Sequence, residues 1–417
     1  MRSAERLLAR VLDRLVRQGT LALTFADGTT RTFGTPAAAF PDVAMRFADA
    51  RVARDTLLDM RLGFAEAWID GRVIIEQGDI MQVVTLLRHN TRWEERRDLA
   101  PPSPTRKLAV RLRHLAKSFN RPGSARRNVA HHYDIGNALY RLMLDETHMQ
   151  YSCAYWPRPD MELAEAQTAK LAHIAAKLAI TPGMRVLDIG CGWGGMAIYL
   201  AQHTGAQVLG ITLSAEQLAL AQERAAAAGV ADRVRFELVD YRDLATRGER
   251  FDRIVSVGMF EHVGQPQFTT FFRACAALLA PDGAMLLHTI GRMGGPGRTD
   301  AFTARYIFPG GYIPALSETL AASESVRLIA TDVEVWRRHY APTLHAWYRK
   351  CLAHRAEIEA LFDERFFRMW TFYLAGAATA FETGGMCNYQ VQYVLDRDAL
   401  PLTRDYMAER EQALLAG

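Results

Sequence analysis

The segment VLDIGCGWGG at 186–195 restricts the possible folds of this chain more than any other stretch of its sequence. Apolar residues of strand type surround Asp188, and four glycines then open a helix-like segment: Gly190, Gly192, Gly194 and Gly195. Glycines in this position let a strand-to-helix turn bring its backbone close to a bound ligand. The segment therefore predicts the first strand, turn and helix of a nucleotide-binding α/β sheet.

The second half of the chain alternates between strand-like and helix-like segments. Strand composition recurs at 185–190, 207–212, 234–240, 251–257 and 284–290. Such alternation predicts a parallel sheet covered by helices. Two further runs, SVRLIATDVEVW and NYQVQYVLD, would complete a sheet of seven strands. The uncharged stretch from Ile189 to Ala215 is long enough to span a bilayer, but its six glycines favour strand, helix and strand of this sheet.

Two cofactor classes are compatible with the glycine loop. Gly190, Gly192 and Gly195 satisfy the G-x-G-x-x-G spacing of dinucleotide enzymes. An acid two residues before the first glycine, here Asp188, is instead typical of S-adenosylmethionine (SAM) sites, where it lies near the amino-acid part of the cofactor. The second strand ends in GITLS and lacks the acid that would bind a dinucleotide ribose. We therefore favour SAM, bound by a Rossmann-like class I SAM-dependent methyltransferase sheet, over a nicotinamide or flavin cofactor.

The missing acid leaves the ribose contact to other residues after the second strand. Thr212 and Gln217 are the candidates for this contact. Ser214 and Gln217 also form the sequence of a capping box, S-x-x-Q, at the start of the next helix. The two interpretations are compatible with each other, and the sequence leaves both open.

The first part of the chain differs in pattern from the second. An amphipathic helix is predicted at 4–17, where one stripe holds Leu7, Leu8, Val11, Leu12 and Leu15. Short apolar runs with turn signals follow it. We predict a small N-terminal α+β domain with its linker over 1–125 and a catalytic domain over 126–417. Residues 106–127 carry eight Lys or Arg and no acid, which indicates either a solvated linker helix or a surface for anionic membrane.

Charge and cysteine content argue against several classes of protein. The net charge is 50 − 46 = +4, which is too small to indicate a nucleic-acid partner. The five cysteines form no C-x-x-C pair and stand at no metal-ligand spacing, so we expect neither a disulfide framework nor a metal site. This cysteine content fits a reducing cytoplasm. The N-terminus lacks the continuous apolar run of a signal peptide, and export is not expected.

Beyond the glycine loop, a series of motifs resembles the cyclopropane-fatty-acyl-phospholipid synthases and the related mycolic-acid cyclopropane synthases. The matching stretches lie in family order between about 126 and 385 and are far more specific together than singly. They are HHYDIGNALYRLMLD, MQYSCAYW, VLDIGCGWGG, GITLSAEQ, VSVGMFEHVG, LLHTIG, RYIFPGGYIP and HYAPTLHAW. The N-terminal stretch LGFAEAWIDGRVIIEQGDI resembles the extension of the phospholipid-acting bacterial branch.

The resemblance implies transfer of the SAM methyl group to a cis double bond of a lipid acyl chain. The resulting carbocation then loses a proton as a cyclopropane ring closes. In this family a bound bicarbonate is understood to serve as anion and base, and its ligands carry over to Cys153, Glu261, His288, the backbone of Ile290, and Tyr340. The SAM contacts carry over, beside Asp188, to Tyr151, Ser152, Gly190, Gly192, Thr212, Gln217, Tyr241 and Arg242.

Without the resemblance, several of these residues would have ordinary structural roles. Cys153 would be a small buried hydrophobe, His288 a core histidine, and Tyr241 a loop tyrosine rather than a neighbour of the adenine. Glu261 follows the fourth strand, where α/β sheets place their ligands, so a functional role is favoured. A carboxylate beside bicarbonate is a like charge, which is compatible with a proton shared between the two.

A lipid substrate requires an apolar channel in place of the bilayer. The segments AFTARYIFPGGYIP at 301–314 and FFRMWTFYLAGAATAF at 366–381 are candidates to line it, with ordinary core packing as the alternative. We expect an unsaturated phospholipid as substrate, peripheral association with the inner face of the membrane, and no nucleic-acid partner; a homodimer is left open. The alternatives are a methyl- or methylene-branched product on the same scaffold and a non-catalytic lipid-binding paralogue.

Overall fold

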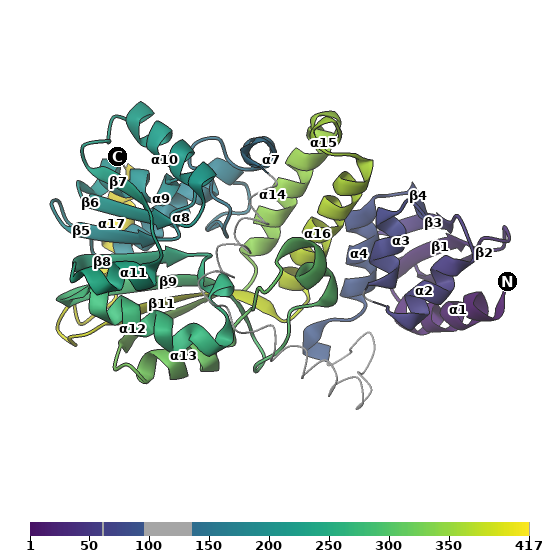
Figure 1. Ribbon diagram of the computed structural model, residues 1–417. Coiled ribbons are helices and arrows are strands. Elements are labelled where there is room, and N and C mark those ends of the chain that lie inside the picture. Colours follow the sequence, from purple (N-terminus) through teal and green to yellow (C-terminus); the bar gives the residue numbers. More distant parts are fainter. Residues whose placement is uncertain (61, 96–135, 417) are drawn as a thin grey trace. The chain divides into compact units, whose positions relative to one another are not determined.

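The computed structural model describes residues 1–60, 62–95 and 136–416, which form two compact units (Figure 1). Unit 1 contains the described residues up to 95 together with Thr299–Pro309 and Leu344–Gly385. Unit 2 contains the described residues from 136 to 298, Gly310–Thr343 and the residues from Met386 on. The predicted boundary at 125/126 and the basic segment 106–127 lie outside the described residues.

Unit 1 begins with a four-stranded sheet and its helices, as predicted for a small α+β domain. The strand order is β2-β1-β3-β4. In α1, Leu8 and Leu12 of the predicted stripe are buried, whereas Leu7 is 50% exposed. The elements are α1 (Ser3–Leu15), β1 (Gly19–Thr24), β2 (Thr30–Thr35), β3 (Asp42–Phe47), α2 (Arg51–Leu58), α3 (Gly63–Ile69), β4 (Val73–Gln77) and α4 (Ile80–His89).

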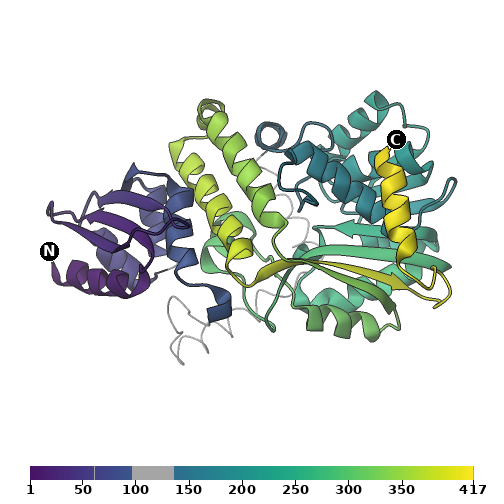
Figure 2. The same ribbon diagram turned by 180° about the vertical axis from the view of Figure 1, so that it is seen from behind.

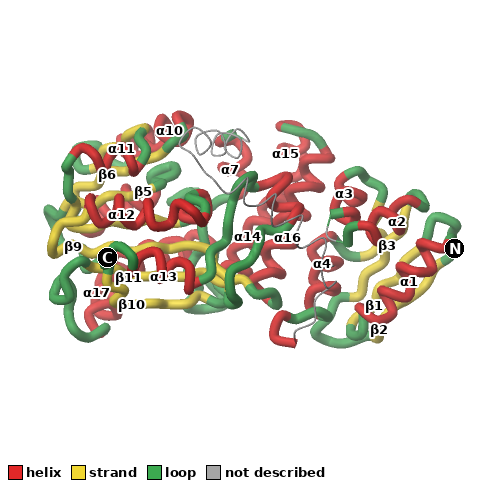
Figure 3. The backbone as a smooth tube through the Cα atoms, turned by 60° about the horizontal axis from the view of Figure 1, so that its bottom comes forward, coloured by secondary structure: helices red, strands yellow, loops and turns green. Residues whose placement is uncertain are grey.

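Unit 1 also takes in helices from far along the chain, which the sequence analysis did not predict. Helix α16 (Glu364–Glu382) packs beside α4 (Figure 3), and Glu382 accepts hydrogen bonds from His345 at 2.6 Å and His89 at 3.3 Å. The Trp68 indole N–H donates to the Arg368 carbonyl at 3.0 Å. Further elements of this part are α14 (Tyr340–Ala353), which starts in unit 2, α15 (Arg355–Leu361) and short helical turns at Trp93–Glu95 and Thr303–Ile307.

Unit 2 is built on the predicted seven-stranded sheet. The strand order is β10-β11-β9-β8-β5-β6-β7, and only β11 runs antiparallel to its neighbours. All seven predicted strands form, and the fifth, β9, is longer than predicted. The strands are β5 (Arg185–Ile189), β6 (Gln207–Thr212), β7 (Val234–Leu238), β8 (Phe251–Val257), β9 (Leu279–Arg292), β10 (Ile329–Trp336) and β11 (Met386–Val394).

Helices cover both faces of this sheet because its apolar side chains alternate between two cores. Val186 packs with the helices of one face, and Leu187 and Ile189 with those of the other. One face is covered by α8 (Leu163–Lys177), α9 (Gly195–Thr204) and α10 (Ala215–Ala227). The other is covered by α11 (Tyr241–Leu244), α12 (Phe268–Leu278) and α13 (Leu316–Glu324).

The uncharged stretch from Ile189 to Ala215 becomes the end of β5, helix α9 and strand β6, as predicted. Its apolar residues therefore belong to the sheet and to the helix that covers it. Among the described residues, no helix combines the length and the apolar character needed to cross a membrane.

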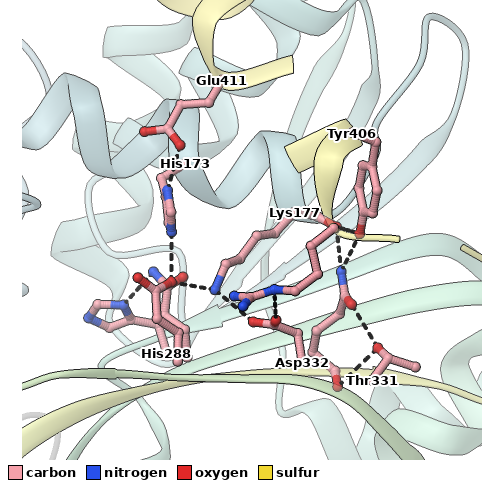
Figure 4. A network of polar contacts seen from close by, with 11 residues as sticks. His173, Lys177, His288, Thr331, Asp332, Tyr406 and Glu411 are labelled. Carbon is pink, nitrogen blue, oxygen red and sulfur yellow. Dashed lines mark hydrogen bonds and ion pairs between the residues drawn. The ribbon is translucent and has the colours of Figure 1, made fainter. Parts of the chain in front are cut away.

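A network of ion pairs holds the C-terminal helix α17 (Asp405–Ala416) against α8 within unit 2 (Figures 2 and 4). His173 on α8 lies between Glu334 at 2.8 Å and Glu411 at 2.7 Å. Lys177, one turn further along α8, pairs with Asp332 at 3.1 Å and with Glu334 at 2.5 Å. Because these charges are paired within the protein, their burial is compensated.

Candidate active site

A cleft opens at the carboxyl ends of β5, β6, β7 and β8, where parallel sheets commonly place ligands. It encloses about 1140 Å³, part of which is open to solvent. Every residue predicted to contact the cofactor lies in its wall: Tyr151, Ser152, Asp188, Gly190, Gly192, Thr212, Gln217, Tyr241 and Arg242. The structure therefore brings together residues that are up to 91 positions apart in the sequence.

The glycine loop combines left-handed backbone conformations with close packing. Gly190 and Gly192 have positive φ values of 83° and 53°, which non-glycine residues rarely adopt. A Cβ atom at Gly192 would meet no protein atom within 4 Å, so this position faces free space. A Cβ atom at Gly195 would lie 2.0 Å from the His148 carbonyl oxygen. The first two glycines thus shape the cleft wall, and Gly195 allows α9 to pack.

Asp188 is a buried carboxylate in the wall of this cleft. Its Oδ2 atom has no hydrogen-bond partner among the described residues. Burial raises the pKa of Asp188 to about 7, against a lowering by the charge of Lys170. A cationic ammonium group in the cleft would supply the missing partner and favour the ionised form.

The residues after β6 form only the first half of the predicted capping box. The Ser214 side chain caps α10 by accepting from the Gln217 backbone N–H at 3.3 Å. The Gln217 side chain does not return to the cap, because its Oε1 accepts from the Thr212 hydroxyl at 2.9 Å. The buried Gln217 Nε2 has no partner among the described residues and remains a donor for a ligand such as a ribose hydroxyl.

Tyr241 and Arg242 form the end of the cleft after β7. The Tyr241 ring packs edge-on against Phe271 with ring centroids 5.4 Å apart. Arg242 is held by Asp240, with a shortest distance of 2.6 Å between the guanidinium and the carboxylate. The ion pair fixes this loop. Tyr241 lines the cleft, where its ring can contact an adenine.

The residues predicted to hold an anion are not in the cleft wall, but Glu261 lies directly beside it. Met259 and His262, on either side of Glu261, both line the cleft. The Glu261 Oε1 accepts from the Ile290 backbone N–H at 2.6 Å, and Oε2 is buried without a partner in the described structure. Burial raises the pKa of Glu261 to about 7. Glu261 can therefore change protonation state near neutral pH.

His288 lies two residues before Ile290 on β9 and is fully enclosed. Its Nε2 is 3.3 Å from the Asn388 amide nitrogen and its Nδ1 is 3.2 Å from the Gln390 amide nitrogen. Burial lowers the pKa of His288 well below its ordinary value, so the ring is neutral and carries one N–H. One of the two amides must therefore turn its oxygen to the ring, and its N–H₂ group can then donate to another acceptor.

Thr343 links the loop that contains Cys153 to the first turn of α14. The Thr343 hydroxyl accepts from the Ala154 backbone N–H at 3.2 Å, one residue after Cys153. Thr343 stands one turn into α14, which begins at Tyr340. Burial raises the pKa of the Cys153 thiol well above its ordinary value, so it remains protonated. This agrees with a weak donor role and not with a nucleophile.

A family model confirms the predicted resemblance. The model of mycolic acid cyclopropane synthetase matches residues 120–391. The chain belongs to this family. The cyclopropane-fatty-acyl-phospholipid synthase of Escherichia coli strain K12 is 46% identical over 262 residues, which cover 63% of this chain and 66% of that protein. The chain thus spans just under two thirds of that relative's length.

Two further comparisons extend the match. The tuberculostearic acid methyltransferase of Mycobacterium tuberculosis is 34% identical over 410 residues, which cover 94% of this chain and 91% of that protein. A solved mycolic acid cyclopropane synthase in complex with S-adenosylhomocysteine (SAH) and CTAB is 34% identical, with a TM-score of 0.60 over 64% of this chain and 97% of that one. The predicted fold, a class I SAM-dependent methyltransferase sheet, is confirmed by the strand order and these homologues.

Sequence reasoning assigned no role to several residues in and around the cleft. His262 lines the cleft, and burial lowers its pKa to about 4, so it is neutral near pH 7. Asn388 and Gln390 contact His288 only because β11 pairs with β9. Lys170 lies buried behind Ser152 on α8. A lysine within the apolar helix sequence AQTAKLAHIAAK was the one available signal for it.

Proposed function

We propose that this protein is a SAM-dependent cyclopropane synthase that acts on a cis double bond in an unsaturated phospholipid acyl chain. The observation that carries the proposal is the position of Glu261, which stands between two cleft-lining residues and is hydrogen-bonded to the Ile290 N–H. A titratable carboxyl beside a cofactor cleft is what proton removal from a methylated substrate requires. Family membership and the named activity of the E. coli relative support the same function.

SAM is the cofactor that fits the cleft. The unpartnered Oδ2 of Asp188 would accept from the amino group of its methionine part, and the free Nε2 of Gln217 would donate to its ribose. When bound, SAM supplies an electrophilic methyl group. Asp188 and Gln217 hold the cofactor on either side of the glycine loop, so that the methyl group is delivered toward the substrate and not to water.

We propose bicarbonate as the anion bound beside Glu261. Its donors would be the Ile290 N–H, which here donates to Glu261, the Cys153 thiol, which here donates to the Ala154 carbonyl, and an amide N–H₂ group beside His288. The buried Glu261 Oε2, which has no described partner, would share the proton of such an anion, because the Glu261 pKa lies near 7. When bound, bicarbonate would serve as the base for ring closure.

The acyl chain needs an apolar path, because exposing about nine methylenes to water would cost roughly 7 kcal/mol at about 0.8 kcal/mol each. On α16, Ala375 and Ala378 are buried, and a Cβ atom at Gly376 would meet no atom within 4 Å. Gly376 therefore borders open space, whereas the two alanines are closely packed. We propose that the segment 366–381 contributes to the acyl-chain path.

The proposed activity is tested by expressing the chain in a bacterium without an enzyme of this family and analysing its phospholipids by mass spectrometry. Unsaturated acyl chains are expected to gain one CH₂ unit, with the added carbon at the position of the double bond. A saturated methyl branch would carry a further pair of hydrogen atoms and would contradict ring formation. Unchanged phospholipids, from a strain with folded protein, would contradict the proposed function altogether.

We also propose that the enzyme works peripherally at the inner face of the membrane, on anionic lipid. The basic segment 106–127 lies outside the described residues, so the proposal rests on its sequence. Neutralising Arg106, Lys107, Arg111 and Arg113 is expected to weaken binding to anionic vesicles by up to about 1 kcal/mol per charge. Co-sedimentation at low and high salt measures this, and the difference should shrink in high salt. Equal binding of wild type and the fourfold variant at low salt would show that the segment does not contribute to membrane docking.

A further inference from the structure

We propose that Lys170 is a positioning residue of the cofactor cleft: from α8 it holds Gln150 and Ser152 in the cleft wall and places a positive charge near Asp188. The identity of the ligand rests on the proposed function. Lys170 does not line the cleft, so it acts through these three residues and not by touching the cofactor.

Helix α8 holds the cleft loop by two side chains. Gln167 and Lys170 are three positions apart and therefore share one face of the helix. The Gln167 amide donates to the backbone carbonyls of Ser152 at 3.0 Å and Gln150 at 3.4 Å. The Lys170 ammonium donates to the Ser152 hydroxyl at 3.0 Å and to the side-chain oxygen of Gln150. Tyr151, a predicted cofactor contact, lies between these two anchored residues.

The same loop is fixed at its other end by a carboxylate. Asp145 accepts from the backbone N–H groups of His148 at 2.6 Å and Gln150 at 3.0 Å. Met149 adopts a positive φ of 50° between them, a conformation that a non-glycine residue keeps only when its surroundings enforce it. Asp145 thus shapes the start of the loop, and Lys170 and Gln167 fix the part that enters the cleft and leads to Cys153.

The charge of Lys170 is not explained by an ion pair within the described structure. Its side chain is completely buried, yet it forms no ion pair with any described carboxylate. Lys177 on the same helix is buried too, but pairs with Asp332 and Glu334. A buried ammonium without an ion pair is costly, and a neutral side chain would fill the space at lower cost. The ammonium group therefore serves the cleft, whose residues Gln150 and Ser152 it contacts.

Lys170 and Asp188 influence each other's protonation. Burial lowers the pKa of Lys170 to about 7, and the negative charges of Asp145 and Asp188 oppose this lowering. Burial raises the pKa of Asp188 to about 7, and the charge of Lys170 lowers it. Removing the lysine charge should raise the pKa of Asp188 further. The ionised carboxylate is the form that binds an ammonium group. Without the lysine charge, the rise in SAH affinity should therefore occur at a higher pH.

The experiment is calorimetric titration of SAH into the full-length protein between pH 6 and pH 8. Lys170→Met is expected to weaken binding about tenfold or more at pH 7, as expected for lost hydrogen bonds to a charged group. It should also move the midpoint of the rise in affinity with pH upward. Lys177→Met is the matched control: it should lower the melting temperature, because Asp332 and Glu334 each lose one partner and keep only Arg404 and His173, respectively. SAH affinity and the pH midpoint should be unchanged.

The outcomes separate this proposal from the proposed function. Wild-type protein that binds no SAH would overturn the cofactor assignment itself. SAH binding by Lys170→Met with wild-type affinity and midpoint would overturn only the role of Lys170. Equal effects of Lys170→Met and Lys177→Met on affinity and midpoint would show a merely structural role. If Lys170→Met does not fold, Lys170→Arg replaces it, because a permanent charge should keep the midpoint from rising; an upward shift there would equally overturn the proposal.

Discussion

Glu261→Gln is expected to reduce turnover about a hundredfold or more, while SAH affinity stays within about twofold of wild type. The substitution keeps the size of the side chain and an oxygen that can accept from the Ile290 N–H. It removes the ability of Oε2, buried and without a described partner, to exchange or share a proton. The defect should therefore appear in the chemical step and not in cofactor binding.

Stability distinguishes this role from a structural one. Burial raises the pKa of Glu261 to about 7, so the folded state holds the proton more tightly than the unfolded state does. A carboxyl with a raised folded-state pKa lowers stability as the pH rises from the unfolded value toward 7, because the unfolded group ionises while the buried group keeps its proton. Glu261→Gln removes this cost. Its melting temperature at pH 8 should equal or exceed that of wild type, although its turnover is lost.

The measurements are turnover on vesicles of unsaturated phospholipid with SAM, calorimetric titration with SAH, and thermal melting. Glu249→Gln is the matched control, since Glu249 precedes the other end of β8 and pairs on the surface with Arg185 at 3.1 Å. It should retain turnover. Near-normal turnover of Glu261→Gln would show that the proton is removed elsewhere and that the anion site has been misplaced.

The cofactor residues could be predicted because each is tied to a local pattern. Asp188, Thr212 and Tyr241 stand at or just beyond the ends of strands that the sequence identifies by their apolar runs. A parallel sheet brings those ends to one edge, so predicting the strands also predicts the cleft. The positions of the glycines follow from the same turn.

The residues that were missed depend on contacts that no local pattern fixes. Asn388 and Gln390 reach His288 through the antiparallel register of β11 on β9, which aligns Asn388 with Ile290 and Gln390 with His288. A shift of this register by one residue would send both amides to the other face of the sheet. Lys170 was hidden for a related reason, because only the packing of α8 against the cleft loop shows that this lysine is buried.

Alanine substitutions in the glycine loop should give the second large effect. At Gly195 and at Gly192 they should impair the protein in different ways. Gly195→Ala is expected to destabilise the fold by several kcal/mol, because its new methyl carbon would lie 2.0 Å from a backbone oxygen, that of His148. Gly192→Ala should cost only about 1–2 kcal/mol, since the strain of its positive φ is the sole penalty in a position that faces free space.

The same free space should make Gly192→Ala the more informative variant for function. If the cofactor's methionine part lies against the loop, a methyl group there occupies the room that the ligand needs, and SAH affinity should fall about tenfold or more in a protein that still melts cooperatively. Calorimetric titration with SAH and with NADH, together with thermal melting, measures both properties. Wild type should bind SAH and not NADH. Unchanged SAH affinity of Gly192→Ala would mean that the ligand does not approach this turn, so Asp188 and Gln217 would have to hold it at a distance from the glycines.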